Sequence, residues 1–377
     1  MWSRYQVRSR QWAGRGNRRK GSLSVALGLL AALAVAACGE SSGSDGSTEV
    51  TFSDTGTFNQ AKPEAPSVEG AELAGVGEVP EPDGDVRVGV LLKTLTNQYW
   101  QQVEAGIEGA KEEFGVDIGP IQGATSENAQ QEQLQICQTL LQQDFDALIV
   151  APETTSNLNP CLDQAESQGT PLINIAAPGP KVPATVYVGP ALLTEGRLAV
   201  DYLAKELEPG SEVAHISGLP GSSAADLRIE GYNEGIKASE LKSVAEVTGD
   251  WDEQTAYQRA QDLLSRFPKL AGIYAANDTM AGAVARAVDQ AGRAGEVLVV
   301  GTDGVPQAIS DIRSGSLAAT ATPFPYYQGF WALEAVARVL DGQDVPLWIE
   351  TSDTMITQEN VDEFFESDDT VKPDLFQ

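Results

Sequence analysis

Short apolar runs alternate with amphipathic segments along residues 85–377, and this alternation restricts the fold more than any other feature. Strands that alternate with helices form parallel sheets covered by helices. Ten such strands fit two doubly wound lobes better than one sheet, so we predict an α/β protein with a ligand cleft between two parallel-sheet lobes. The expected strands are 86–92, 116–122, 147–150, 172–175, 186–188, 212–217, 243–248, 272–275, 297–301 and 317–320.

The N-terminal residues have the pattern of an export signal. Seven Lys and Arg residues and no Asp or Glu precede an apolar run from Leu23 that ends at Cys38 and is short for a membrane span. Leu33 to Cys38 resembles the bacterial lipobox, in which the cysteine receives lipid and becomes the new N-terminus. We therefore expect a signal peptide over 1–37 and a lipidated Cys38. A cut near Ala37 with an incidental cysteine, or an uncut anchor helix, are the alternatives.

The chain is strongly acidic, with 25 basic and 54 acidic residues. Seven of the basic residues precede Cys38, so the processed chain carries 18 minus 54, or −36. Such a charge disfavours binding to nucleic acid and to anionic membrane surfaces. Because the acidic residues are spread along the chain, we interpret them as a solvated surface.

Residues 38–84 are rich in Gly, Ser, Pro, Glu and Asp and show scarcely any apolar periodicity. A segment of this composition buries too little surface to offset the entropy of the chain. We expect the lipidated cysteine followed by a flexible acidic linker that holds the globular part near the membrane.

Few residues are available for metal binding or for nucleophilic catalysis. Apart from Cys38 the chain has only Cys137 and Cys161, on predicted consecutive helices, which favours a disulfide in an exported protein; two buried free thiols are the alternative. The single histidine, His215, lies in an apolar strand and is interpreted as a packed residue. No metal site and no cofactor are expected.

Polar and aromatic residues follow the first expected strand. Residues 93–100 read Lys-Thr-Leu-Thr-Asn-Gln-Tyr-Trp, and rings stack on sugars while amides and charges bind hydroxyls. Trp100 belongs to the core by helical periodicity, whereas Tyr99 lies off that face, toward the expected cleft. Polar residues also follow two later strands, within 274–280 and 299–306.

These segments, together with 221–228 and 249–252, resemble in order and spacing the periplasmic sugar-binding proteins of the ribose and allose type, which have the type I periplasmic binding protein fold. The resemblance covers about residues 85–361 and implies two lobes joined by a three-segment hinge. It places the hinge at 189–192, 322–323 and 341–345. The N-terminal lobe would then comprise 85–190 and 323–342, the C-terminal lobe 191–322 and 343–361, and a tail 362–377.

The resemblance also implies the ligand contacts. Asn97 and Lys93 would bind sugar hydroxyls, and Tyr99 and Trp100 would stack on the sugar. From the other lobe, Trp251 would stack, Arg228 would donate, Asp303 would accept, and Asn277 would do either. The alternatives are that Asp303 and Asn277 cap the helices that follow them and that Arg228 pairs only with Glu230 or Asp226.

The sequence departs from the family at three places. Relatives commonly have an Asp and often an Arg where this chain has Ala176-Ala177-Pro178, and a hinge Gln where it has Pro323. A site that lacks these partners is expected to bind a different ligand, with an apolar or deoxy edge on the Ala176 side. Lys93 could equally face a carboxylate or a phosphate.

The resemblance implies a carrier that captures a monosaccharide or polyol and delivers it to the permease and ATPase of an ABC importer. We expect a monomer, either anchored by its lipid on the extracytoplasmic face of the bacterial cell membrane or in the periplasm. The alternatives are a sensor module of the same fold that feeds a membrane receptor or kinase, and an exported glycosidase that uses Asp303 with Asp278 or Asp250.

Overall fold

The structure is a computed structural model that describes residues 67–70, 79, 86–177, 186–343, 345–372 and 375–376. The expected signal peptide (1–37), Cys38 and most of the expected linker lie outside the described residues, as does Pro178.

The first lobe is built on an eight-stranded sheet whose pairings are all parallel among the described residues. The strand order is β1-β13-β7-β6-β5-β2-β3, and β4 also pairs with β2. The strands are β1 (Ser67–Glu69), β2 (Arg87–Thr94), β3 (Asp117–Ile118), β4 (Gln122–Ala124), β5 (Ala147–Val150), β6 (Leu172–Ile175), β7 (Val186–Gly189) and β13 (Trp348–Glu350).

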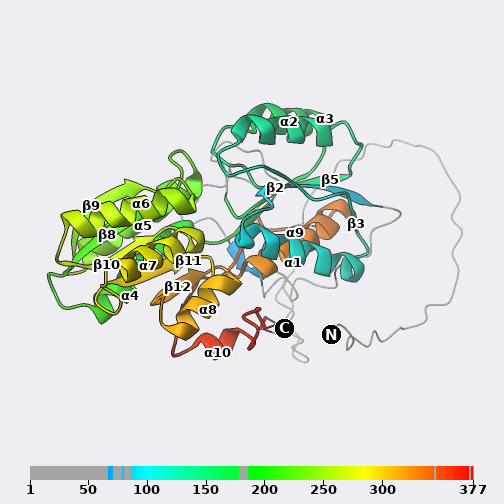
Figure 1. Cartoon of the computed structure of the whole chain (residues 1–377). Helices are drawn as coiled ribbons and strands as arrows, with labels where there is room; N and C mark the ends of the chain where they lie inside the picture. Colours follow the sequence, from blue (N-terminus) through cyan, green and yellow to red (C-terminus); the bar gives the residue numbers. More distant parts are fainter. Residues whose placement is uncertain are drawn as a thin grey trace, which may run out of the picture. The chain divides into compact units, whose positions relative to one another are not determined.

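Helices cover both faces of this sheet (Figure 1). They are α1 (Gln98–Phe114) and α9 (Pro325–Leu340) on one face, and α2 (Gln130–Leu140) and α3 (Asn159–Gln168) on the other. Side chains alternate along a strand, so β2 turns Val88 and Val90 toward the core with α1 and α9 and turns Leu91 toward the core with α2 and α3.

The second lobe contains a six-stranded sheet of order β14-β12-β11-β10-β8-β9, in which only β12 and β14 are antiparallel. The strands are β8 (Glu212–Ser217), β9 (Lys242–Thr248), β10 (Leu270–Ala275), β11 (Leu298–Thr302), β12 (Ala319–Thr322) and β14 (Thr354–Thr357). The helices of this lobe are α4 (Leu192–Glu206), α5 (Ser223–Ala238), α6 (Glu253–Arg266), α7 (Asp278–Gln290), α8 (Pro306–Ser314) and α10 (Val361–Phe364). The predicted α/β class with two parallel-sheet lobes is confirmed.

Helix α1 illustrates how the sequence determines an element that borders the cleft. Asn97 caps the helix by accepting from the Tyr99 amide at 2.9 Å, and Gly115 ends it with a left-handed φ of 63°. The expected apolar face is buried, including Trp100. Tyr99, placed off that face by its spacing, is buried as well, because α9 packs against α1 there.

The chain passes between the two sheets three times. The first passage joins β7 to α4, and the second joins β12 to α9. The third lies at residues 351–353, between β13 and β14, and not at 341–345 as expected. The reason is β13, whose Trp348 is buried and donates through Nε1 to the carbonyl oxygen of Gly189 at 2.9 Å. A strand of three residues is too short to be recognised from periodicity.

Part of the expected linker is ordered as a strand. Ser67–Glu69 pairs in parallel with Trp348–Glu350 as β1. The expectation of a structureless segment is wrong there, because the edge of β13 offers backbone groups that an extended segment of almost any composition can bind.

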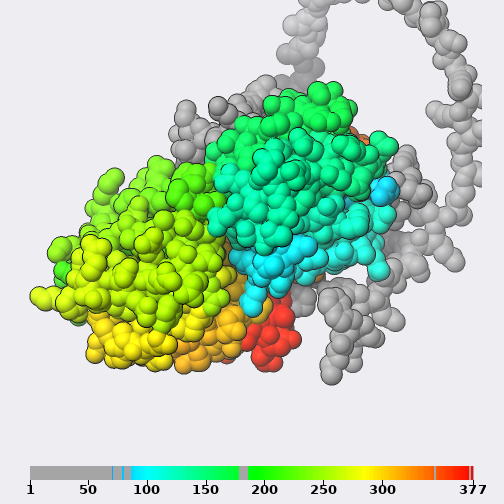
Figure 2. Space-filling model, turned by 45° about the horizontal axis from the view of Figure 1, so that its top comes forward, coloured from blue at the N-terminus to red at the C-terminus, as the bar shows by residue number. Residues whose placement is uncertain are grey.

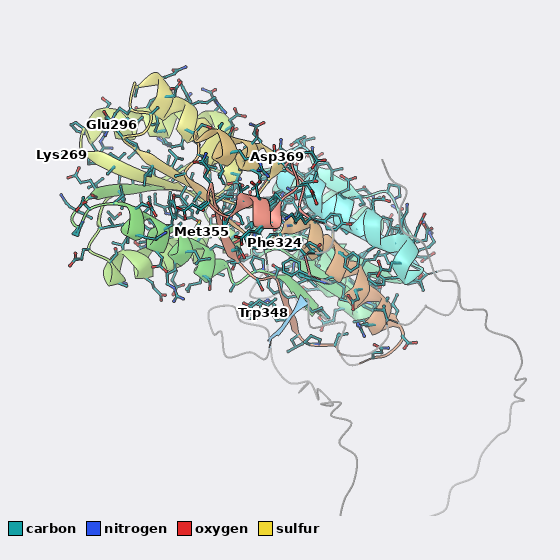
Figure 3. All side chains as sticks on the ribbon, turned by 90° about the horizontal axis from the view of Figure 1, so that it is seen from below. Lys269, Glu296, Phe324, Trp348, Met355 and Asp369 are labelled. Atoms are coloured by element: carbon teal, nitrogen blue, oxygen red, sulfur yellow. A yellow bond between two sulfur atoms is a disulfide. The ribbon has the colours of Figure 1, made fainter. Side chains whose placement is uncertain are left out.

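The expected C-terminal tail folds back onto both lobes. Arg313 of α8 pairs with Asp362 and Asp369, whose Oδ1 lies 2.8 Å from Arg313 Nε. The Tyr327 hydroxyl of α9 donates to the carbonyl oxygen of Lys372 at 2.9 Å. Figure 3 shows Phe324 and Asp369 beside α10, close to the second passage between the sheets. The tail is therefore part of the folded body near the hinge.

Two expectations about single residues hold. Cys137 of α2 and Cys161 of α3 form a disulfide, with their Cα atoms 6.1 Å apart. His215 is buried in β8, where its ring stacks between those of Tyr232 and Tyr274 at centroid distances of 4.8 and 4.9 Å.

Membrane-spanning helices and metal-binding groups are both absent from the described residues. No helix in this part of the chain is both long and apolar enough to cross a bilayer. Within the same residues, no three side chains of His, Cys, Asp or Glu form a group that could hold a metal ion.

We predict that Phe376→Ala lowers the free energy of unfolding by about 1–3 kcal/mol, because its ring packs against three others at the hinge. The centroid distances are 4.8 Å to Tyr327, 5.2 Å to Phe324 and 5.5 Å to Trp331. Thermal unfolding measures the loss, and Phe376→Leu should recover most of it. An unchanged melting temperature in the alanine variant would show that the tail adds nothing to stability.

Candidate ligand-binding site

A cavity lies where the carboxyl ends of the strands of both sheets face each other. It contains every ligand-binding residue expected from the sequence, together with one glutamate and three alanines. The lining residues are Lys93, Asn97, Tyr99, Trp100, Glu127, Ala176, Ala177, Ala224, Arg228, Trp251, Asn277 and Asp303.

The cavity is well shielded from solvent. Apart from Asn97 and Glu127, its lining residues are between 3% and 7% exposed, so charges there are screened far less than at a surface. The two lobes meet along a seam in Figure 2, with the first lobe in cyan and the second in yellow. Backbone amides also join the lobes, from Thr155 to the carbonyl oxygen of Gly221 at 3.2 Å and from Gln307 to Gln98 Oε1 at 3.2 Å.

Strand order determines the position of each residue around the cavity. In the first lobe, Ala176 follows β6, Lys93 is the residue before the last of β2, and Glu127 follows β4, so β5 and β2 separate the alanine from the glutamate. In the second lobe, Trp251 follows β9 and Asp303 follows β11, and the residues that follow β8 and β10 lie between them.

Arg228 is fixed by a buried partner that the sequence did not reveal. Its Nε donates to Glu195 Oε2 at 2.6 Å, its Nη2 donates to Glu195 Oε1 at 3.2 Å, and its Nη1 donates to the carbonyl oxygen of Ala276 at 2.6 Å. The alternative of pairing with Glu230 or Asp226 is wrong, because the buried face of α5 turns Arg228 toward α4. Burial lowers the pKa of Arg228, but Glu195 and Asp303 more than offset this, so Arg228 stays charged.

Asp303 is left with uncommitted oxygens. Its Oδ1 lies 3.8 Å from Arg228 Nη2, and no hydrogen bond to its carboxylate arises from the described residues. Burial raises the pKa of Asp303 well above its ordinary value, and Arg228 opposes that rise. The alternative that Asp303 caps the next helix is wrong, because α8 begins after Val305 without a side-chain cap.

Asp278 holds the loop that carries Asp303. Its Oδ2 accepts from the amides of Gly304 at 2.7 Å and Val305 at 3.1 Å, and its Oδ1 accepts from Thr320 Oγ1 at 2.7 Å. Burial raises the pKa of Asp278 to about 7, although these hydrogen bonds lower it. Asp278 therefore supports the loop and does not line the cavity.

Asn277 combines the two roles considered for it. Its Oδ1 caps α7 by accepting from the Met280 amide at 2.9 Å, and the residue also lines the cavity. Because its oxygen is occupied, its Nδ2 is the group left to donate to a ligand.

Glu127 accepts hydrogen bonds from two other residues that line the cavity in the first lobe. Its Oε1 accepts from Asn97 Nδ2 at 2.8 Å and from Trp100 Nε1 at 3.3 Å. The ammonium of Lys93 lies 5.7 Å from the centroid of the Trp100 ring. Glu127 was missed because one acidic residue in a polar loop carries no distinctive pattern.

The Tyr99 hydroxyl is committed to the hinge. It donates to Gln328 Oε1 at 2.6 Å, and Gln328 Nε2 donates in turn to the carbonyl oxygen of Pro323 and to Thr351 Oγ1, each at 3.3 Å. The part of Tyr99 that remains for a ligand is its ring. The hinge thus has a glutamine, Gln328, although Pro323 occupies the position where one was expected.

Trp251 is held in the cavity wall by an unusual backbone. Asp250 and Trp251 have left-handed φ values of 57° and 61°. The indole packs so closely on Gly218 that a Cβ there would lie 2.0 Å from a ring carbon. Its Nε1 is buried and has no hydrogen-bond partner among the described residues, so it can donate to a ligand.

The cavity also has an apolar side. Ala176 and Ala177 follow β6, and Ala224 lies in the first turn of α5. Methyl groups neither donate nor accept hydrogen bonds, so a ligand edge next to them gains only from contact with apolar surface.

Glu153 and Lys93 are two buried ionisable groups of the first lobe, and the charge of each affects the pKa of the other. Glu153 is 1% exposed, and neither of its carboxylate oxygens has a hydrogen-bond partner among the described residues. Burial raises the pKa of Glu153 to about 8, and Lys93 lowers it in part. Burial lowers the pKa of Lys93, and Glu127 and Glu153 oppose this.

Two lobes that enclose a shielded cavity lined by rings, amides and charges define a protein that holds a small ligand.

Comparison with known proteins gives the family. Residues 88–344 match the periplasmic binding protein domain family. The D-allose-binding periplasmic protein of Escherichia coli (strain K12) is 34% identical over 270 residues, which cover 68% of this chain and 86% of that protein. The ribose import binding protein of Bacillus subtilis (strain 168) is 27% identical over 270 residues, which cover 70% of this chain and 87% of that protein.

A solved structure agrees with these relatives. The periplasmic solute-binding protein of an ABC transporter from Actinobacillus succinogenes 130z, with bound D-allose, has a TM-score of 0.70 and 26% identity, and the match covers 74% of this chain and 100% of that one. The chain belongs to the periplasmic binding protein domain family, which confirms the resemblance read from its motifs. It is a solute-binding protein and not an enzyme.

We predict that Glu153→Gln stabilises the protein increasingly as pH rises from about 4.5 to 8. The raised pKa means that the folded protein keeps a proton that the unfolded chain releases over this range, so the stability of the unchanged protein falls with rising pH. The variant has no carboxyl group to titrate at this position. Its free energy of unfolding should therefore exceed that of the unchanged protein by on the order of 1–3 kcal/mol at pH 8 and by little at pH 4.5. Thermal unfolding across pH measures the difference, with exposed Glu166→Gln as the control. Equal gains at both pH values would contradict the assignment.

Proposed function

We propose that this chain is an extracytoplasmic, lipid-anchored protein that captures a monosaccharide or related polyol and delivers it to an ABC-type importer. The observation that carries the proposal is the cavity itself, which is lined by the Trp251 ring and the Asp303 carboxyl group of one lobe and by the Tyr99 and Trp100 rings of the other. Rings provide contact with the apolar face of a sugar, and a carboxylate accepts from two neighbouring hydroxyls.

The shielded setting favours a neutral ligand with several hydroxyl groups. Lys93 and Arg228 already lie near Glu127, Glu153, Glu195 and Asp303, so the positive charge of the cavity is balanced by the protein. A carboxylate or phosphate would add negative charge to a region that holds more acidic than basic groups. We therefore favour a sugar or polyol over an anion as the partner of Lys93.

The relatives support this class of ligand. By their names they bind D-allose and ribose, and one solved structure of similar fold, from Agrobacterium vitis, has bound D-fucose, with 25% identity and a TM-score of 0.70. The alanines at the end of β6 favour a ligand with a deoxy or other apolar edge on that side, as the departures from the family predict.

A thermal-shift screen with aldoses, ketoses, deoxy sugars, polyols, inositols, sugar acids and sugar phosphates tests the proposal, because a ligand of the folded state raises the melting temperature. A shift with a neutral sugar or polyol is expected, and the same ligand should compact the protein in small-angle scattering if binding closes the lobes. Shifts confined to anions, or no shift at all, would contradict the proposal.

Trp251→Ala and Asp303→Ala should each weaken binding of that ligand by about 10-fold or more, because each removes a stacking surface or a carboxylate from the cavity. Titration calorimetry measures the affinity. Tyr257→Ala and Asp262→Ala, which lie in the same lobe outside the cavity, serve as controls. Unchanged affinity in both cavity variants would show that the ligand binds elsewhere.

We predict that Cys38→Ser releases the protein from the membrane fraction of cells that express the full chain, because the serine cannot form the thioether to lipid. Fractionation followed by immunoblotting measures the distribution. Retention of the variant in the membrane fraction would contradict lipid anchoring at Cys38.

A further inference from the structure

Glu127 has one committed and one uncommitted carboxylate oxygen. Both hydrogen bonds that the described residues donate to it, from Asn97 Nδ2 and Trp100 Nε1, end on Oε1. Glu127 lines the cavity and is only partly buried. Oε2 is therefore an acceptor that the fold leaves unused at the wall of the ligand site.

The ammonium group of Lys93, on the same wall, is also free to bind a ligand. Lys93 is 3% exposed, and its ammonium donates no hydrogen bond to the described residues. The ammonium lies 5.7 Å from the centroid of the Trp100 ring, whose Nε1 donates to Glu127 at 3.3 Å. An acceptor and a donor thus lie near each other at the same end of the first-lobe wall, and one hydroxyl group can use both because it donates and accepts.

The strand order makes this end of the wall different from the other. Glu127 follows β4 and Lys93 is the residue before the last of β2, whereas Ala176 and Ala177 follow β6 on the far side of β5. Within the described wall of the first lobe, a carboxylate acceptor therefore borders the cavity only at the β4 end. A bound ligand would therefore need a hydroxyl group on the edge that faces the β4 end and could lack one on the edge that faces the β6 end.

We propose that Glu127 binds the ligand directly and determines specificity. Its Oε2 accepts a hydrogen bond from a ligand hydroxyl, to which Lys93 donates, while its Oε1 keeps Asn97 and Trp100 in position. The ligand is then a sugar or polyol with a required hydroxyl at the β4 end and a dispensable one at the β6 end. This inference rests on the proposed function and adds a contact that selects among its ligands.

Glu127→Gln tests the proposal at a single atom. The amide oxygen can still accept from Asn97 and Trp100, but the group that replaces Oε2 is now a donor and the negative charge is gone. We expect affinity for the sugar or polyol found in the screen to fall about 10- to 100-fold, as for loss of a charge-assisted hydrogen bond. A dissociation constant within twofold of the unchanged protein would show that Glu127 only positions Asn97 and Trp100, and would overturn the proposal.

Monodeoxy analogues of the same ligand identify the hydroxyl. Removal of one hydroxyl should cost the unchanged protein at least 10-fold in affinity and cost Glu127→Gln little, since the partner is already lost. If every deoxy analogue lost the same factor against both proteins, the direct contact would be excluded.

Glu132→Gln is the matched control. Glu132 accepts from the Thr125 amide at 3.1 Å and from its hydroxyl at 2.7 Å at the start of the same loop, but it does not line the cavity. Its substitution should leave affinity unchanged, and a loss equal to that of Glu127→Gln would assign the effect to movement of the loop and overturn the proposal.

If no sugar or polyol bound the unchanged protein, the proposed function itself would fail. Normal binding by the unchanged protein, with the same affinity in Glu127→Gln, would reject only the role of Glu127.

Discussion

A buried ion pair between Arg228 of α5 and Glu195 of α4 holds the second-lobe wall of the cavity in place. Removing two charges from water costs several kcal/mol for each ion, and only good geometry with further hydrogen bonds offsets the cost. Both carboxylate oxygens of Glu195 accept hydrogen bonds from Arg228, and the carbonyl oxygen of Ala276 accepts a third. Once Arg228 is fixed, its guanidinium lies 5.9 Å from the centroid of the Trp251 ring and 3.8 Å from Asp303. The positions of the aromatic and acidic groups of this wall thus depend on one pair.

Backbone strain is concentrated at the same place. Among the described residues other than glycine, seven have a left-handed or otherwise positive φ, and three of these, Ala176, Trp251 and Asp303, line the cavity. Such conformations cost about 1–3 kcal/mol each and persist only where the surrounding structure enforces them. Here Gly218 makes room for the Trp251 ring, and Asp278 holds the loop after Asp303. The fold therefore spends part of its stability on placing these three residues.

The sequence predicted what depends on periodicity and missed what depends on distant pairing. The strands 147–150, 172–175 and 212–217 have the expected bounds, because each is a continuous buried run between clear breaks. Strand β13 is too short for a periodic signal and exists because it pairs with β7 and β1. In the site, the motifs after the strands located eight lining residues, whereas Glu195 and Glu127 acquire their roles only through partners that the fold brings near. Burial of a charge, which decides such roles, cannot be read from one sequence.

The pairing of β1 with β13 makes the two lobes unequal. The chain before Ser67 reaches the folded body through a strand of the first lobe, so that lobe is the fixed frame for anything that holds the N-terminus. If the first lobe is held still, any change in the angle between the lobes is a movement of the second lobe. The moving part then carries Ala224, Arg228, Trp251, Asn277 and Asp303, and the stationary part keeps Lys93, Glu127, Ala176 and Ala177. A reporter of lobe motion is therefore best attached to the outer surface of the second lobe, on α6 for example, where it moves relative to the first lobe.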